Sequence, residues 1–558
     1  MMQKLEDYIL DTLSIRKKMW IVLAATLGLF LFSVLLIPTG AVLAKMLPGK
    51  NSNTFNVYID LPQGSSVSQT KNIGSCVVGI LQKEKEVTDI ELFLGSGSPL
   101  DFAGLIKGSS LKQGEHVAEV VVNITKPHHR DEPSFMMVHR LRKALVQTCS
   151  PMVKGTHLKM VEPPAGPPTQ AAVVAEIYGP QGEGLRLLSD KVEKIFEKTE
   201  GLVDIDSFKD KRYTKYEIKV DSDKVSRSQL TIKQVNEIVY LAFEGMNVSV
   251  KNSKFSPDQI PVHLVLSNES KMIEDNTLAS IEAKLSALKL MNKVGVMIAL
   301  NEVVDIEKSH SNPMLMSKNL KSMIAVVAET DLVSQIYPLL DAKENIEKTL
   351  SDAYEISSGS MLNLELKDRK TGEEFSLFWD GELKVTLDTF AELGGAFIAA
   401  LILIFLLMVI YYKSFAYAGI VLLGSFLSII GVIIGHMIVD IFTSETFFLT
   451  ATSLIGFIAL IGISSRNSLL LIDFTFSLIE KGMEQNKAIA LAVATRAKPI
   501  FLTAVAIILA STLLAGDAVF GGLGVALIFG TLAAVVASLI VVPVLLHFTD
   551  MKETLSHK

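Results

Sequence analysis

A single arginine stands near the middle of a long apolar run of this chain. Arg466 lies within the segment 462–473 (GISSRNSLLLID), and a lone cation inside a bilayer costs several kcal/mol unless it meets an anion or water. Asp473 follows two helical turns later on the same helix face, too far for direct contact without Asn467 or water between them. We therefore expect Arg466 to need a partner from elsewhere; the alternative is an arginine that only pins two helices together.

Two further patterns lie in the neighbouring apolar runs. The hydroxyl of Thr503 could pass or position a proton, although an isolated threonine commonly bonds a carbonyl of its own helix. Small residues recur at every fourth position of the last run, where they would let another helix approach closely for sliding or for static packing. These residues are Gly522, Ala526, Gly530, Ala534 and Ser538.

Cysteine and histidine offer little further chemistry. Cys76 and Cys149 lie in the polar part of the chain, where a disulfide is permitted, but each could equally be a small buried side chain. His128 and His129 are adjacent in a proline-bounded loop without a third ligand, so we expect no metal there.

Motifs of enzymes and ATPases are missing. Gly49-Lys50 lacks the glycine and the hydroxyl residue of a phosphate-binding loop, since Ala44 and Asn51 stand at those positions. G-x-S-x-G and H-E-x-x-H are also absent. We expect no enzyme and no cofactor; any transport would run on an ion gradient.

Six apolar runs are long enough to cross a bilayer as helices. The chain is 49% hydrophobic and 20% charged, and the apolar residues gather in blocks. The runs are approximately 19–38, 392–412, 415–438, 447–474, 499–515 and 520–547. Residues 1–18 predict an amphipathic helix on the inner membrane face, or alternatively a docking helix, and not a cleaved signal peptide.

Lysine and arginine in the short connections predict the orientation. They are Lys4, Arg16, Lys17, Lys18, Lys413, Lys481, Lys487, Arg496 and Lys498. The opposite loops, 439–446 and 516–519, contain none. Both termini are therefore expected in the cytoplasm and the large polar domain outside it, and the net charge of −6 gives no basic surface for nucleic acid.

The polar domain alternates strand-like and helix-like segments. Its first part reads as strand 55–61, helix 66–84, strand 89–94, strand 117–125, helix 134–149 and strand 156–162. After a proline-rich hinge at 163–168, the second part reads as strand 171–178, helix 184–200 and strand 214–220, continuing with strand 322–328, helix 332–353 and a final strand. Residues of about 222–316 interrupt it as an insert. The expected fold is an α-helical polytopic membrane protein whose external α+β domain contains two split βαβ subdomains.

The membrane segments resemble the last three spans of resistance-nodulation-division efflux pumps of the hydrophobe/amphiphile type. The resemblance rests on 455–475 (IGFIALIGISSRNSLLLIDFT), 496–503 (RAKPIFLT) and 519–545, and on YIDLPQGSS after the first span. It covers nearly the whole chain. It implies that Arg466 occupies the position of the family's intramembrane lysine, Thr503 that of its relay threonine and Arg496 that of its cytoplasm-side arginine.

The apolar runs and the positions of lysine and arginine predict a cytoplasmic helix at 1–18, a first span at 19–38, a five-helix bundle at 392–548 and a cytoplasmic tail at 549–558. The resemblance implies the boundaries of the external domain. The first porter subdomain would be 40–165, the second 166–221 with 317–388, and the docking insert 222–316.

Two departures from the family shape the expected function. Arginine cannot release its proton as lysine can, so a fixed-charge role is favoured. No span contains the adjacent aspartate pair of the family's first half. We expect the C-terminal half of a proton-driven pump in the bacterial inner membrane, exporting drugs or other amphiphilic small molecules. It would act with an N-terminal half that carries the aspartates, in a trimer with a periplasmic adaptor and an outer-membrane channel. The alternative is a non-transporting membrane subunit whose external domain binds a lipid or a protein.

Overall fold

The chain folds into two compact units, and each is described by itself. The first unit comprises Met1–Lys209 and Leu315–Lys558, and the second comprises Asp210–Met314. The computed structural model describes residues 2–49, 51–99, 102–109, 112–163, 166, 169–209, 213–271, 273, 277–312, 315–360, 362–443 and 446–551. Most of the expected hinge at 163–168, Lys50 and most of the expected tail lie outside the described residues.

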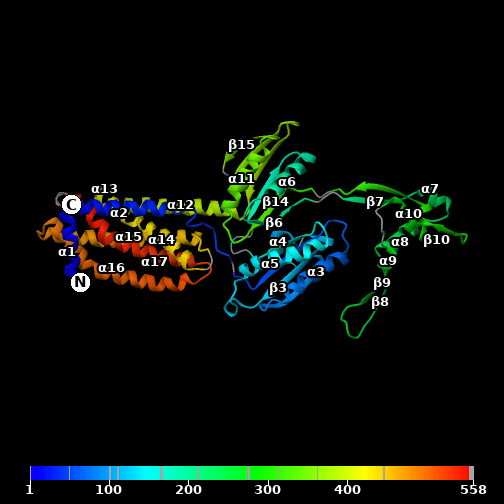
Figure 1. The fold of residues 1–558 in the computed structure, drawn as a ribbon, viewed down its shortest axis with the longest axis horizontal. Helices are drawn as coiled ribbons and strands as arrows, with labels where there is room; N and C mark the ends of the chain where they lie inside the picture. Colours follow the sequence, from blue (N-terminus) through cyan, green and yellow to red (C-terminus); the bar gives the residue numbers. More distant parts are fainter. Residues whose placement is uncertain are drawn as a thin grey trace. The chain divides into compact units, whose positions relative to one another are not determined.

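Helices dominate one part of the first unit (Figure 1). Six helical segments of the described chain are long and apolar enough to cross a membrane. They are α2 (Arg16–Leu35), α12 (Glu382–Tyr412), α13 with α14 (Phe415–Phe426 and Ser428–Phe442), α15 (Ala451–Glu480), α16 (Gln485–Ala515) and α17 with η5 and α18 (Gly521–Val536, Ala537–Val541 and Val542–His547).

The amphipathic helix α1 (Met2–Ser14) packs on protein. Ile9 and Leu13 are each 1% exposed, within a hydrophobic core that includes Ile489 and Val493 of α16. Ile9 and Leu13 therefore face α16, as the second interpretation of this segment, a docking helix, predicts. Tyr8 of the same helix is 54% exposed.

The small-residue ridge of α17 is buried against other helices of this chain. A Cβ atom added to Gly530 would lie 2.2 Å from Cδ1 of Leu460, and one added to Gly522 would lie 2.3 Å from Oγ1 of Thr450. Ala526, Ala534 and Ser538 are fully buried as well. The ridge therefore lets α15 approach α17 closely.

The first lobe is a four-stranded sheet with two helices packed on it. Its strands, in the order β2-β3-β1-β4, are β1 (Thr54–Asp60), β2 (Val87–Ser96), β3 (Gln113–Ile124) and β4 (His157–Val161). Helices α3 (Val67–Leu81) and α5 (Ser134–Cys149) bury their apolar faces on the sheet. A disulfide joins Cys76 of α3 to Cys149 of α5, so the pair is bonded and not merely buried. A short helix, α4 (Phe102–Lys107), precedes β3.

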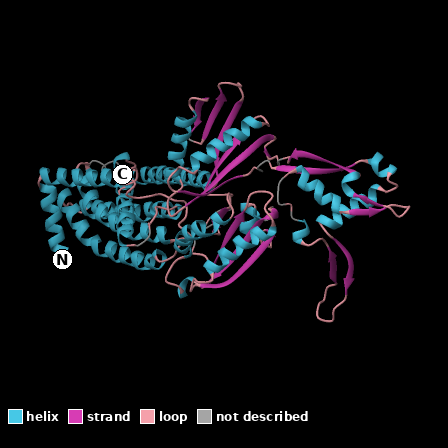
Figure 2. Cartoon of the chain, turned by 45° about the vertical axis from the view of Figure 1, so that its right-hand side comes forward, coloured by secondary structure: helices cyan, strands magenta, loops and turns pink. Residues whose placement is uncertain are grey.

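The second lobe is a seven-stranded sheet (Figure 2). Its strands are β5 (Val173–Tyr178), β6 (Leu202–Ser207), β13 (Ser317–Lys318), β14 (Lys321–Thr330), β15 (Tyr354–Ser360), β16 (Asn363–Asp368) and β17 (Glu374–Asp380). The order is β13-β14-β5-β17-β16-β15, and β6 also pairs with β14. Helices α6 (Glu183–Phe196) and α11 (Ile336–Leu350) cover a core in which Phe196 stacks on Trp379 at 6.0 Å between ring centroids.

One predicted strand belongs elsewhere. The segment 214–220 forms β7 (Thr214–Val220), but β7 pairs with β12 (Val304–His310) in the second unit and not with the second lobe. The strand that follows α6 in the second lobe is β6, which the sequence analysis missed. Asp204 and Asp206 give β6 an unfavourable strand composition, and in the described part of the chain their ion-pair partners are cations of the first lobe.

The second unit therefore begins earlier in the chain, at Asp210, than the insert expected at 222–316. Because β7 and β12 pair with each other, both strands of this ribbon belong to the unit. The unit also contains α7 (Ser222–Arg227), α8 (Ile232–Phe243), α9 (Asn268–Lys271), α10 (Leu278–Ala287), β8 (Met246–Lys251), β9 (Ile260–Leu264), β10 (Lys289–Met291) and β11 (Met297–Ala299). Its core surrounds Val235, Leu285 and Leu300.

Candidate functional site

Arg466 lies on the exposed side of α15. The residues around it, Ser464, Ser465, Asn467 and Ser468, are buried, whereas Arg466 points away from the bundle of this chain. Within the described part of the chain, Arg466 forms no ion pair. A guanidinium inside a bilayer requires an anion or water, and the described part of this chain offers Arg466 no ion pair.

Asp473 is engaged away from Arg466. Its Oδ2 accepts a hydrogen bond from the Tyr411 hydroxyl at 3.0 Å, and its Oδ1 accepts one from the Tyr412 hydroxyl at 3.1 Å. Both tyrosines end α12. The structure thus joins Asp473 to the neighbouring helix α12. Two adjacent tyrosines at the end of the apolar run 392–412 could have indicated this contact, but the sequence analysis did not consider them.

Arg496 and Thr503 both lie on α16 and do not meet Arg466. The Arg496 guanidinium lies over the ring of Phe474 on α15, with its carbon 4.7 Å from the ring centroid. The Nε of Arg496 is buried and has no hydrogen-bond partner in the part of the chain that the structure describes. The Thr503 hydroxyl donates to the carbonyl of Ile500 at 2.9 Å, the bond within one helix that was considered for it.

A buried histidine was missed by the sequence analysis. Nδ1 of His436 on α14 lies 2.8 Å from the carbonyl oxygen of Val432, and Nε2 lies 2.8 Å from Oγ of Ser453 on α15. A carbonyl only accepts, so Nδ1 of His436 carries a proton and donates it to Val432. The network continues to Thr450, which caps α15.

Ion pairs join the two lobes, and within the described residues their cations lie on the first lobe and their anions on the second. They are Lys107–Glu329, Lys112–Asp206, Arg142–Asp204, Arg142–Asp331 and Lys159–Asp206. Nδ1 of His139 also lies 2.7 Å from Oδ2 of Asp331. Burial raises the pKa of Asp206, but the Lys159 and Lys112 ammonium groups outweigh it and hold that pKa below its usual value. Ion pairs are therefore a principal interaction between the two lobes.

A cleft of about 790 Å³ opens beside these ion pairs. Its walls come from α5, from the start of β4 and from β6. Burial is the largest influence on Asp204, and it raises the pKa of this carboxyl even though Arg142 lowers it. Opening the cleft would separate charges that are paired in this structure.

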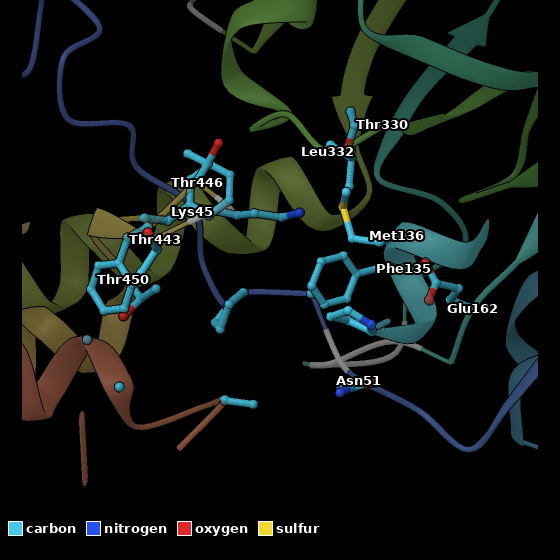
Figure 3. A pocket seen from close by; sticks show the side chains of 18 of the residues that line it. Lys45, Asn51, Phe135, Met136, Glu162, Thr330, Leu332, Thr443, Thr446 and Thr450 are labelled. Atoms are coloured by element: carbon cyan, nitrogen blue, oxygen red, sulfur yellow. The ribbon is translucent and has the colours of Figure 1, made fainter. Parts of the chain in front are cut away.

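A second cavity, of about 680 Å³, lies where spanning helices end beside the first lobe (Figure 3). Figure 3 shows Lys45 reaching into it from one side, with Phe135, Met136 and Glu162 on the other. Arg142 and Asp331 line both this cavity and the cleft. Among the described residues, no group of three or more His, Cys, Asp or Glu side chains could hold a metal ion.

Long apolar helices, two α/β lobes and a unit inserted between strands of the second lobe together define the fold of the resistance-nodulation-division transporters. Residues 6–550 match the model of the AcrB/AcrD/AcrF family, and the chain belongs to this family.

Relatives of known sequence or structure agree with this assignment. The swarming motility protein SwrC of Bacillus subtilis (strain 168) is 22% identical over 533 residues, which are 94% of this chain and 45% of SwrC. Two crystal forms of a heavy metal efflux pump share the fold, at TM-scores of 0.72 and 0.71 and 16% identity. They match 97% and 98% of this chain but 51% and 52% of the pump. The chain therefore spans about half the length of these relatives.

Proposed function

We propose that this chain is one half of a proton-driven efflux transporter and that it works with a second half carrying the proton-binding carboxylates. Arg466 carries the proposal. It is exposed on α15, inside a segment apolar enough to span a membrane, and it has no ion pair within the described chain. A cation that lacks a partner inside a bilayer is strongly unfavourable, so the face of α15 that presents Arg466 would contact the other half.

In this mechanism Arg466 acts as a fixed charge. Its guanidinium keeps its proton at any physiological pH, so protons would bind to the carboxylates of the other half. The positive charge lowers the pKa of those carboxylates, while burial raises it. Proton binding would weaken their attraction to Arg466 and allow the helices to shift, and the movement would reach the lobes through α12, which follows β17 directly.

The cleft between the lobes is the proposed route of the substrate, an amphiphilic small molecule such as a drug. The structural relatives are heavy metal pumps, and a metal ion is the second candidate. The amphiphile is favoured because the described residues contain no group of three ligands for a metal and because basic side chains line the cleft.

The proposed setting is the bacterial inner membrane, with both termini in the cytoplasm and the lobes in the periplasm. A trimer with an adaptor and an outer-membrane channel would complete the pump. The second candidate function, a non-transporting subunit that binds a lipid or protein, is favoured by the missing aspartate pair.

The test measures efflux per folded complex when the chain is co-expressed with a matching half. Arg466→Ala should abolish efflux without lowering the amount of complex, whereas Arg466→Lys should retain it because the charge remains. Lys481→Ala removes an exposed lysine at the end of α15 and serves as the control. Near-normal turnover of the Arg466→Ala complex would exclude the relay role, and a loss of folded complex would indicate a structural pin.

A further inference from the structure

The cavity at the helix ends is separate from the proposed relay. None of Arg466, Asp473, Arg496 or Thr503 lines it. Its walls come from the segment after α2, from α5, and from the connections that precede α15 and α17. It therefore lies where apolar helices give way to the polar lobes, which is the level at which the charged head of an amphiphile would meet the protein.

The backbone that carries Lys45 is fixed at this cavity. Ala44 forms a parallel bridge with Leu449, and the amide of Lys45 donates to the carbonyl of Leu449 at 3.1 Å. From the second lobe, the Ser334 hydroxyl donates to the carbonyl of Ala44 at 2.5 Å. The Lys45 side chain starts from this anchored point and extends toward Leu332 (Figure 3).

The other ionised groups of the wall have partners within the chain. Arg142 and Asp331 form an ion pair at 2.8 Å. Oδ1 of Asp517 accepts the amides of Val519 and Phe520, each at 2.8 Å, at the start of α17. These contacts compensate three of the charges that line the cavity.

Lys45 differs from these groups. It forms no ion pair within the described residues, and its ammonium lies 5.5 Å from the ring centroid of Phe448. The side chains of Thr443 and Thr446 line the same side of the cavity, and the Thr443 hydroxyl donates to the carbonyl of Val439 at 3.0 Å. An ammonium can bind the oxygens of an anion.

Apolar side chains form much of the remaining wall. They are Phe135, Met136, Leu332, Phe442, Phe447 and Phe448. We propose that the cavity binds an anionic amphiphile, whose charged head contacts the Lys45 ammonium and whose apolar tail lies on the aromatic wall. Binding of this kind does not depend on proton-driven transport.

Glu162 makes the binding depend on pH. Burial raises the pKa of its carboxyl to about 7, the Ser134 hydroxyl donates to it at 3.2 Å, and Arg142, Glu329 and Lys45 are the charged groups that act on it. Below this pH the carboxyl is neutral, and above it a negative charge opposes a bound anion. The affinity for an anionic amphiphile therefore falls as the pH rises through about 7.

The test uses the full chain in phosphatidylcholine nanodiscs, with Phe447→Trp as a fluorescent reporter in the wall. The probe is decanesulfonate brominated at the end of its tail, which quenches nearby tryptophan and stays ionised across the pH range. Decyltrimethylammonium with the same bromine is the cationic counterpart. The chain without the reporter corrects for its own two tryptophans, Trp20 and Trp379.

Lys45→Gln should weaken binding of the sulfonate roughly tenfold, the scale of a hydrogen bond to a charged group. Lys45→Arg should retain it, and Lys481→Gln, the same change at an exposed lysine distant from the cavity, should have no effect. Glu162→Gln should remove the dependence on pH. Equal quenching by the two probes, or equal affinity in the parent chain and Lys45→Gln, would overturn the proposal.

Phosphatidylglycerol added to the nanodiscs separates two sources of the anion. If it competes with the sulfonate in the parent chain but not in Lys45→Gln, a membrane lipid occupies the site. If the sulfonate still binds through Lys45 at the same affinity, the ligand is an amphiphile taken from solution. Either result supports the site and assigns its source.

Discussion

At the residue scale, Arg142 of α5 holds two carboxylates of the second lobe. It pairs with Asp204 at 3.1 Å and with Asp331 at 2.8 Å, and the Asp204 side chain is only 4% exposed. Removal of one partner from a buried ion pair costs about 3–5 kcal/mol, because the other charge stays buried. We expect Arg142→Gln to lower the thermal stability of the chain, as measured by the loss of folded protein on heating.

The matched control is an exposed ion pair. Lys219 and Glu307 pair on the surface of the second unit, and Lys219→Gln should leave the melting curve unchanged, because exposed pairs contribute little. The loss in Arg142→Gln should shrink as the pH falls, since burial raises the pKa of Asp204 and the protonated Asp204 carboxyl needs no counter-charge. An equal effect of the two substitutions would contradict the buried role of Arg142.

Glu162 provides a second prediction at this scale. Its pKa is raised from 4.5 to about 7 by burial, so the folded state binds its proton more tightly than the unfolded state. The contribution of Glu162 to stability is therefore greatest below pH 4.5 and is lost as the pH rises to about 7. Glu162→Gln should raise the free energy of unfolding above pH 7 by up to about 3 kcal/mol. In this variant the free energy of unfolding should also fall less steeply between pH 5 and 7. A decline of the same steepness in the variant would show that another group titrates.

At the scale of elements, glycines determine how closely α14 and α17 approach. A Cβ atom on Gly431 of α14 would lie 2.2 Å from the carbonyl oxygen of Phe529 on α17, and backbone cannot move aside as a side chain can. Gly431→Ala should therefore force the helices apart, at a cost of about 1–3 kcal/mol. Fluorescence-detected size-exclusion chromatography after heating measures the fraction that remains folded. Gly419→Ala on α13, where no atom lies within 4 Å of the added carbon, should behave as the parent chain.

The strands show which sequence-based predictions failed because the pairing partner of a strand lies far away in the sequence. Periodicity predicted β1 to β5 and β14, because alternation and β-branched residues report that a segment is buried in a sheet. The same pattern in 214–220 predicted a strand but not its partner, since strand propensity carries no information on pairing. β7 joined β12, whereas the acidic segment 202–207 became a strand of the second lobe because Arg142, Lys112 and Lys159 neutralise it.

At the scale of the whole molecule, the positions of lysine and arginine predict a topology. α1 contacts α18, so the beginning of the described chain and the end of its last apolar helical segment lie at the same end of the bundle. Alkaline phosphatase inserted near residue 130 should be active, because it folds only outside the cytoplasm, and the same enzyme fused after Lys558 should be inactive. Activity from the fusion after Lys558 would reverse the proposed orientation.

Much of this protein was determined by its sequence alone. The apolar runs predicted spanning helices because a bilayer offers the backbone no hydrogen-bond partner other than itself. The motifs around Arg466 and 496–503 predicted the resistance-nodulation-division family, to which the chain belongs. Such features are local, so neighbouring residues suffice to reveal them.

Only the tertiary structure decided which side chains meet. It paired Asp473 with Tyr411 and Tyr412, bonded Cys76 to Cys149, and buried Ile9 and Leu13 of α1 against α16. It also brought Lys45 and Glu162 to one cavity from segments more than a hundred residues apart. The physical reason is that burial and charge at a site depend on packing between distant segments, which no local pattern of residues records.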